Sequence, residues 1–260
     1  MKSQLRTLFL VLAGFGIYYA LQKLYFKPIK EYLDGLTHDG LASYILTYLL
    51  IGIPIIIATK LIRPNLSLGE NFGLRAPFLT ALGWALFFAL PMLLGGLVLN
   101  GLSDTLVWRN VVAGTLIAAL VEEIYFRGFL FGMLYKYTKA GFLTAIIFGA
   151  VIFALGHLYQ SNESMEMLGI FGITFMGAGL YAWLYVEWDY NLWVPIFLHT
   201  FMNLAWTLSD MGDSALGGLW PNILRAGTIT LSIVGTLIYK KKTNKPLKIT
   251  KHNLFIQTES

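Results

Sequence analysis

Apolar residues run through the chain in long stretches, which charged residues, prolines and turn residues separate from one another. A helix needs about 20 mainly apolar residues to cross roughly 30 Å of hydrocarbon. Windows of this kind predict transmembrane helices over residues 5–25, 41–60, 78–100, 108–136, 140–160, 166–187, 191–208 and 222–239. The first window begins beside two cations, as the apolar region of a signal peptide does. Its apolar stretch is too long for such a region, so we expect a transmembrane helix that is not cleaved off. The pattern predicts an all-α, polytopic membrane bundle of about eight transmembrane helices.

Composition excludes a soluble domain, because 57% of the residues are hydrophobic and 13% are charged, whereas soluble chains carry about 25% charged residues. The chain has no cysteine, which excludes disulfides, thiol nucleophiles and cysteine-bound metal. The formal net charge of +5 would suit a nucleic-acid binder. However, six of the nineteen cations lie in the C-terminal tail: Lys240, Lys241, Lys242, Lys245, Lys248 and Lys251. Such a cluster after an apolar span is typical of an anchor that faces anionic lipid, so we expect a lipid bilayer and no nucleic acid as partner.

The distribution of Lys and Arg predicts the orientation. Eight spans place both termini on one side of the membrane. The loops and tails on that side hold 13 cations, and the loops on the opposite side hold 5, one of which is Arg225. Cytoplasmic loops carry the excess of cations. We therefore expect a multi-pass protein of the cell membrane with both termini in the cytoplasm.

Ionisable side chains within the apolar windows are costly in hydrocarbon and mark functional sites. In the window 108–136, Glu123 and Arg127 are four residues apart in the favourable order for an ion pair on one helical face. Glu122 is rotated by about 100° and has no partner three or four residues away on its helix. An unpaired carboxylate in a dry bundle is suited to act as a general base, although it could instead form a hydrogen bond to a neighbouring helix.

Two histidines lie in later windows. If the hairpin after Glu122 turns near Lys139, Glu122 lies 17 residues before the turn and His157 lies 18 after it, which predicts similar depth and a shared water. His199 and Asn203 are one helical turn apart, and both can present N–H groups to one developing oxyanion. Zinc is an alternative, with Glu122, His157 and His199 as ligands, but the HExxH spacing of common zinc proteases is missing.

Three motifs on three separate spans, in this order along the chain, resemble those of the CAAX-protease and bacteriocin-processing family (CPBP, or Abi) of intramembrane proteases. They are EExxxR at Glu122, Glu123 and Arg127, FxxxH at Phe153 and His157, and HxxxN at His199 and Asn203. The resemblance covers a core at residues 108–208. About three transmembrane helices at 1–107 carry no recognised signature, and 209–260 hold the last helix and the basic tail.

The resemblance implies an intramembrane endopeptidase that cleaves a membrane-associated protein or peptide. Glu122 and His157 would activate water, and His199 and Asn203 would hold the oxyanion. Glu123, Arg127 and Phe153 would support the site. The family has been classed among the metalloproteases, but its members resemble glutamate-dependent enzymes, so we expect no obligatory cofactor, with zinc as the alternative. A second class of function is a non-catalytic membrane immunity or scaffold protein of the same fold, and a third is a proton-coupled transporter.

Overall fold

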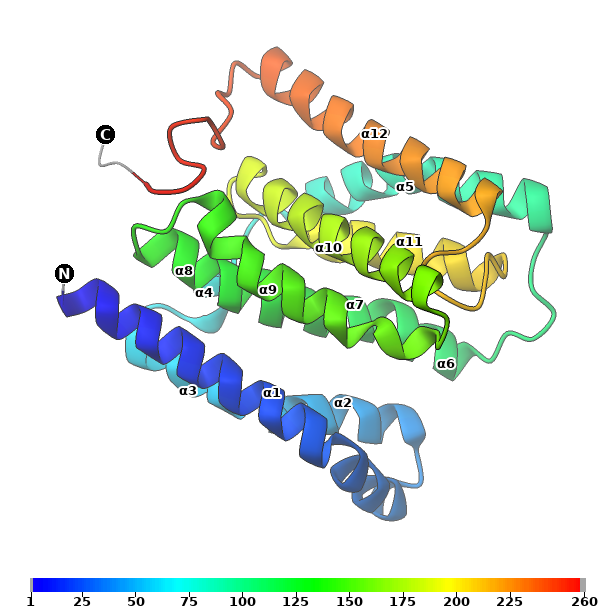
Figure 1. Ribbon diagram of the computed structural model, residues 1–260, viewed down its shortest axis with the longest axis horizontal. Coiled ribbons are helices and arrows are strands. Elements are labelled where there is room, and N and C mark those ends of the chain that lie inside the picture. The colour runs from blue at the N-terminus through cyan, green and yellow to red at the C-terminus, as the bar shows by residue number, and fades with distance from the viewer. Residues whose placement is uncertain (1, 258–260) are drawn as a thin grey trace.

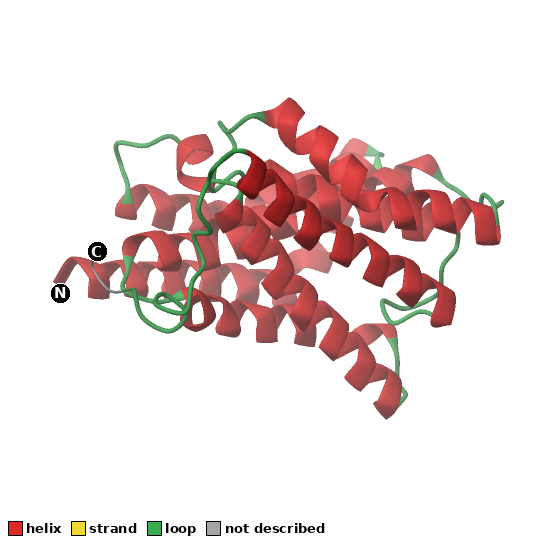
Figure 2. Ribbon diagram, turned by 90° about the horizontal axis from the view of Figure 1, so that it is seen from above, coloured by secondary structure: helices red, strands yellow, loops and turns green. Residues whose placement is uncertain are grey.

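The computed structural model describes residues 2–257, and Figure 2 shows these residues as helices joined by loops. No strand occurs among them, and the single bridge of strand type joins Ala140 to Ile256. This confirms the predicted all-α class.

The helices follow one another along the chain, and several of the connections are only a few residues long. Their bounds are α1 (Lys2–Thr37), α2 (Gly40–Ile51), α3 (Ile53–Ile62), α4 (Leu68–Phe72), α5 (Phe78–Asn100), α6 (Trp108–Val112), α7 (Ala118–Glu122), α8 (Gly132–Tyr137), α9 (Phe142–Gly156), α10 (Ser164–Glu187), α11 (Trp193–Leu208) and α12 (Leu219–Lys242). Two π-helical segments, η1 (Ala113–Ile117) and η2 (Glu123–Phe131), join α6, α7 and α8 into one continuous helix, and a short 3₁₀ turn, η3 (Leu158–Gln160), follows α9.

The bundle has three parts, which Figure 1 shows one above another. At one side α1 packs against α2 and α3, and at the other α12 packs against α5. The helices between them include α7, α9, α10 and α11, and α11 also packs against α5. The chain segments that carry the three motifs therefore lie in the middle of the bundle.

Six helical stretches of the described chain are long and apolar enough to cross a membrane, and they correspond to six of the eight predicted windows: Ser3–Thr37, Gly40–Ile62, Phe78–Asn100, Phe142–Gln160, Ser164–Glu187 and Leu219–Lys242. The other two windows form the continuous helix Trp108–Tyr137, which carries the charged motif, and the 16-residue helix α11. A helix of that length rises only about 24 Å. Both lie in the middle of the bundle, where neighbouring helices surround them.

The window 41–60 forms two helices rather than one, with the junction at Gly52. Pro54 is the second residue of α3 and has no N–H to continue the hydrogen-bond ladder of α2. The hydroxyl of Tyr125 donates to the carbonyl of Tyr48 at 2.8 Å, and a Cβ at residue 52 would lie only 2.0 Å from that hydroxyl oxygen. Glycine at this junction therefore lets the motif helix approach α2.

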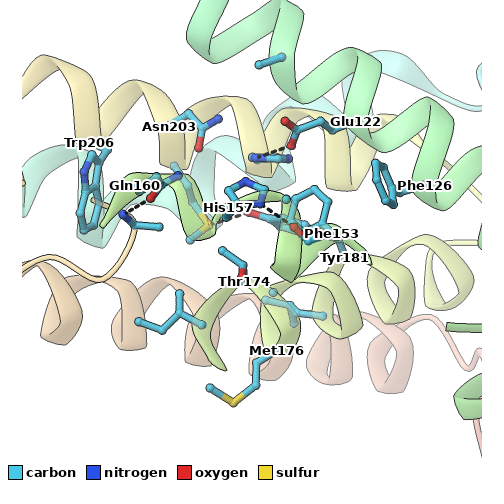
Figure 3. A pocket seen from close by; sticks show the side chains of 18 of the residues that line it. Glu122, Phe126, Phe153, His157, Gln160, Thr174, Met176, Tyr181, Asn203 and Trp206 are labelled. Carbon is cyan, nitrogen blue, oxygen red and sulfur yellow. Dashed lines mark hydrogen bonds and ion pairs between the residues drawn. The ribbon is translucent and has the colours of Figure 1, made fainter. Parts of the chain in front are cut away.

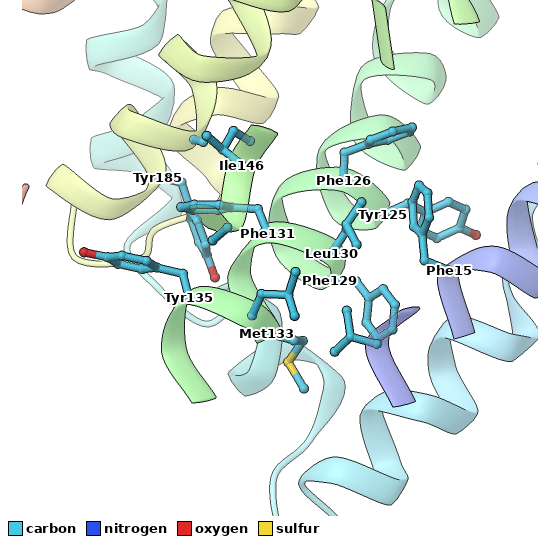
Figure 4. Packing of buried hydrophobic residues seen from close by; sticks show 14 of the residues in the cluster. Phe15, Tyr125, Phe126, Phe129, Leu130, Phe131, Met133, Tyr135, Ile146 and Tyr185 are labelled. Atoms are coloured by element: carbon cyan, nitrogen blue, oxygen red, sulfur yellow. The ribbon is translucent and has the colours of Figure 1, made fainter. Parts of the chain in front are cut away.

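The main hydrophobic core surrounds η2, whose side chains are almost all buried. Figure 4 shows Phe126, Phe129, Leu130 and Phe131 extending from this helix toward its neighbours, with Phe15 of α1 on one side. Phe15 meets Phe126 edge to face at 5.2 Å between ring centroids. Aromatic packing on several sides thus fixes the helix that carries the EExxxR motif.

The basic tail is partly an internal element of the bundle. Lys240 is buried and pairs with the buried carboxylate of Glu187 at the end of α10, which also accepts hydrogen bonds from the backbone N–H groups of residues 248 and 249. Lys245 and Lys248 pair with Asp189, and the hydrogen bond from Lys245 to this carboxylate raises the pKa of the lysine. Half of the six lysines that predicted a lipid-facing anchor therefore form ion pairs within the protein.

Further along the tail, backbone carbonyls cap the first turn of α9. The N–H groups of Gly141, Phe142 and Leu143 donate to carbonyls of residues 253–255 at 2.7–2.9 Å. The first N–H groups of a helix have no partner within it, so this contact satisfies them. The tail thereby holds the end of the helix that leads to His157.

Replacing Glu187 by alanine is expected to destabilise the protein strongly, by about 3–5 kcal/mol, because it leaves the charge of Lys240 buried without its partner. Asp189 is the matched control, since its side chain is 51% exposed where that of Glu187 is 0% exposed, and it also pairs with lysines. Its replacement by alanine is expected to cost about 0–1 kcal/mol. Thermal unfolding of both variants in detergent measures the difference, and equal shifts in Tm would refute this account of the tail.

Candidate active site

The EExxxR motif lies where the helix changes from α-helical to π-helical hydrogen bonding. Glu122 is the last residue of α7, and Glu123 begins η2. Segments of π-helix are rare and frequently occur at functional sites. The sequence predicts one long helix here, and the structure keeps it continuous but alters its winding at the two glutamates.

Glu123 and Arg127 form the ion pair that their spacing predicts. Arg127 Nη1 lies 3.1 Å from Glu123 Oε1, and both side chains are 0% exposed. The guanidinium of Arg127 also lies over the rings of Phe153 on α9 and Tyr181 on α10, at 4.5 Å and 5.4 Å from their centroids. Arg127 thus connects the first motif to the second and to α10.

His199 is the second partner of Glu123. Its Nδ1 lies 2.8 Å from Glu123 Oε1, and because a carboxylate only accepts, Nδ1 carries the proton of this hydrogen bond. The other ring nitrogen, Nε2, lies 3.9 Å from Glu122 Oε2. The ring stacks on Tyr181, with 5.0 Å between centroids. One histidine therefore contacts both glutamates of the motif, one through each nitrogen.

His157 is held in a comparable way at the end of α9. Its Nδ1 lies 2.7 Å from the carbonyl oxygen of Phe153, which can only accept, so Nδ1 donates. In the neutral ring Nε2 is then an unprotonated acceptor. The hairpin turns between Tyr137 and Phe142, as predicted, and both Glu122 and His157 line one cavity.

Asn203 follows His199 by one turn of α11 and lines the same cavity. One N–H of its amide donates to the carbonyl of Gly114 at 3.3 Å, which leaves its second N–H for another acceptor. The hydrogen bond fixes the amide against η1. The sequence could not reveal this contact, because the two residues lie 89 positions apart.

These side chains surround a cavity of about 1130 Å³. Figure 3 shows Glu122, His157 and Asn203 facing a common space from three helices, with Phe153 and Tyr181 beside them. Glu123 and Arg127 lie behind this surface and do not line the cavity. The four residues predicted to be catalytic thus share one cavity, and two of the three supporting residues lie behind its wall.

The donors around the cavity include types that bind zinc. Two imidazole nitrogens and a carboxylate are suitable ligands in kind, and each histidine has the second hydrogen bond that ligating histidines usually make. Within residues 2–257, however, no three His, Asp or Glu side chains lie close enough together to hold one ion. The arrangement of these residues does not fit a zinc site.

Sequence reasoning missed several residues of the cavity. Tyr181 and Trp206 lie within apolar windows without any spacing that distinguishes them, and Tyr18, Tyr44 and Tyr48 line the side formed by α1 and α2. Arg225 was counted in a loop, but it lies on α12 and also lines the cavity.

Comparison with known proteins finds a match over the part of the chain that carries the motifs. Residues 86–205 match the family described as Type II CAAX prenyl endopeptidase Rce1-like, and this range includes every motif residue. A similar protein is the "Putative membrane peptidase YdiL" of Bacillus subtilis (strain 168), 34% identical over 96 residues. The match covers 36% of this chain and about a third, 34%, of the length of that protein. No solved structure matches the chain.

The three motifs and their meeting at one cavity lie within the part of the chain that the family match covers. Residues 86–205 are thus similar to the Rce1-like family of type II CAAX prenyl endopeptidases.

Proposed function

We propose that this protein is an intramembrane endopeptidase, which hydrolyses a peptide bond of a membrane-associated protein or peptide. The observation that carries the proposal is the meeting of Glu122, His157, His199 and Asn203 in one cavity of a bundle with membrane-spanning helices. A general base and N–H donors around a water-accessible space are the groups that acyl transfer to water requires.

Water is the nucleophile in this mechanism, and Glu122 is its base. The carboxylate of Glu122 takes a proton from the water while the water oxygen attacks the carbonyl carbon of the peptide bond. The unprotonated Nε2 of His157 accepts a second hydrogen bond from the same water and orients it, because Nδ1 is committed to Phe153. Glu122 then returns the proton to the leaving amine as the carbon–nitrogen bond breaks.

The oxyanion of the tetrahedral intermediate is held by Asn203 and His199. Asn203 offers the amide N–H that Gly114 does not use, and His199 offers Nε2–H when its ring is protonated. Glu123 and Arg127 support this arrangement from behind the cavity, since Glu123 fixes the tautomer and orientation of His199. Phe153 contributes through its carbonyl to His157 and through its ring to Arg127.

The protein is a multi-pass membrane protein, with the lipid bilayer as its surroundings. The described ends of α1 and of the tail lie at the same end of the bundle in Figure 1. Together with the excess of cations in the connections at that end, this supports a cytoplasmic position for both termini.

Hydrolysis is expected to continue after chelation, because the proposed mechanism assigns the base, the water-orienting group and the oxyanion donors to side chains. Purified protein should contain far less than one zinc per chain by elemental analysis and keep its full rate after treatment with a chelator. Loss of activity that added zinc restores would instead assign a metal to Glu122, His157 and His199.

The direct test of the function is reconstitution. Protein in nanodiscs is incubated with a mixture of apolar peptides, and mass spectrometry identifies new peptide termini. We expect cleavage products that do not form when the same peptides are incubated with empty nanodiscs. Their absence with a broad peptide mixture and with extracted membrane proteins would favour the scaffold function.

A further inference from the structure

We propose that Arg225 forms an anion subsite in the cavity and binds a carboxylate of the peptide substrate a few residues from the cleaved bond. The inference rests on the proposed function, because it assigns a further part of the same substrate. Arg225 lies on α12, outside the region 86–205 that the family match covers.

Arg225 is a buried cation whose partners are all neutral. Arg225 is 8% exposed. Its guanidinium donates to Asn222 Oδ1 at 3.1 Å and to the carbonyl of Ala215 at 2.6 Å. The guanidinium also lies over the ring of Trp206, 4.6 Å from the centroid. Within residues 2–257 no carboxylate forms an ion pair with it.

A buried charge without a counter-ion is unfavourable, and an anion that enters beside it offsets that cost. A guanidinium has five N–H donors, of which two are used here. Its planar arrangement of donors matches a carboxylate, which it binds through two parallel hydrogen bonds.

The nearby carboxylates do not supply the missing charge. Glu166 accepts hydrogen bonds from the hydroxyls of Ser161 and Ser214, and Asp213 lies exposed at the rim of the cavity. Neither pairs with Arg225. The cation therefore remains available to a ligand in the cavity.

The distance between Arg225 and the reacting groups can be estimated along α11, because Trp206 of this helix contacts Arg225. His199, Asn203 and Trp206 lie on successive turns of α11, and Figure 3 shows Trp206 beyond Asn203 on the side away from Phe126. Trp206 is seven residues after His199, which corresponds to about 10 Å along a helix axis. An extended peptide covers that distance with about three residues. The carboxylate is therefore that of the chain end or of an acidic side chain within a few residues of the cleaved bond.

Binding of peptides to the Glu122→Gln variant tests the subsite without any need for cleavage. The probes are fluorescent apolar octapeptides in three forms: a free C-terminal carboxylate, a C-terminal amide, and the amide with one internal glutamate. Affinity is measured by fluorescence anisotropy in nanodiscs of neutral phosphatidylcholine, with empty nanodiscs as the blank. We expect the free acid to bind about tenfold or more tightly than the amide. If the internal glutamate restores tight binding to the amide, an acidic side chain is the source of the carboxylate.

Arg225→Gln should remove this preference and leave the affinity for the amide unchanged, which also reports an intact cavity. Arg225→Lys should keep a reduced preference, since it retains the charge but loses the planar donors. Lys23→Gln is the matched control, because it removes another cation that lines the cavity, and the preference should persist.

Equal binding of acid and amide in the presence of Arg225 would overturn the proposal, and this comparison requires no change at Arg225. An acid preference that survives in Arg225→Gln would overturn it as well. A preference that depends on Arg225, in a protein that cleaves no peptide, would keep the subsite and reject the peptidase function.

Discussion

Replacing Glu122 by glutamine will lower the rate of peptide hydrolysis by about 10²–10⁴-fold or more, because the amide cannot take a proton from water. Glutamine keeps the size of the side chain and its capacity for hydrogen bonding. Glu122 lines the cavity and is not the partner of Arg127, so the fold should survive. The measurement is the cleavage rate in nanodiscs, together with Tm in detergent.

Glu31→Gln is the matched control for this variant. Glu31 lies on α1 in an exposed ion pair with Lys27, away from the cavity, and its replacement should change neither rate nor Tm. Processing at the normal rate in Glu122→Gln would contradict the mechanism and favour the scaffold function. A transporter that uses Glu122 as a proton relay would show substrate flux in liposomes, which a peptidase would not.

The second large effect is expected at Arg127. Arg127→Met leaves the carboxylate of Glu123 buried without a cation, which should destabilise the protein by about 3–5 kcal/mol. It also removes the contacts of the guanidinium with Phe153 and Tyr181. Thermal unfolding in detergent measures the loss, and Arg75→Met, which breaks an exposed pair with Glu70, should have little effect.

The double variant Glu123→Gln with Arg127→Met separates stability from activity. It removes both buried charges, so much of the lost stability should return. Activity should stay low, because glutamine can accept the proton of His199 Nδ1 only as a weaker, neutral acceptor. A double variant that unfolds as readily as Arg127→Met, or one that is fully active, would contradict the role assigned to Glu123.

Much of the fold could be predicted from the sequence, because an apolar window with enough residues to cross a membrane has few alternatives to a helix. The windows at 78–100 and 166–187 agree closely with α5 and α10. Gly52 and Pro54 mark the break between α2 and α3 in the sequence, but hydropathy alone predicts one window there. The π-helical winding at Glu123 was not predictable, since packing against neighbouring helices rather than local periodicity determines it. The internal pairs of the tail were missed because their acidic partners lie about 50–60 residues earlier.

In the candidate site, too, contacts between residues close in sequence could be predicted and contacts between distant residues could not. Spacing on one helix predicted the pair of Glu123 and Arg127. Hairpin arithmetic predicted similar depth and a shared water for Glu122 and His157, and the two residues line one cavity. The contact between His199 and Glu123 joins residues 76 positions apart, and no spacing rule reaches that far. Arg225 was assigned to a loop by its charge, whereas Trp206 and neutral acceptors hold it on a helix.

The central claim is that this cavity hydrolyses peptide bonds of membrane-associated substrates, and comparison of protein termini in membranes tests it most directly. Membranes of cells that carry the wild-type protein are compared by mass spectrometry with those that carry His157→Ala. The account predicts a set of new termini near lipid-anchored or apolar segments in the wild type, which the variant lacks. Identical sets of termini, with both proteins present at equal levels, would contradict it.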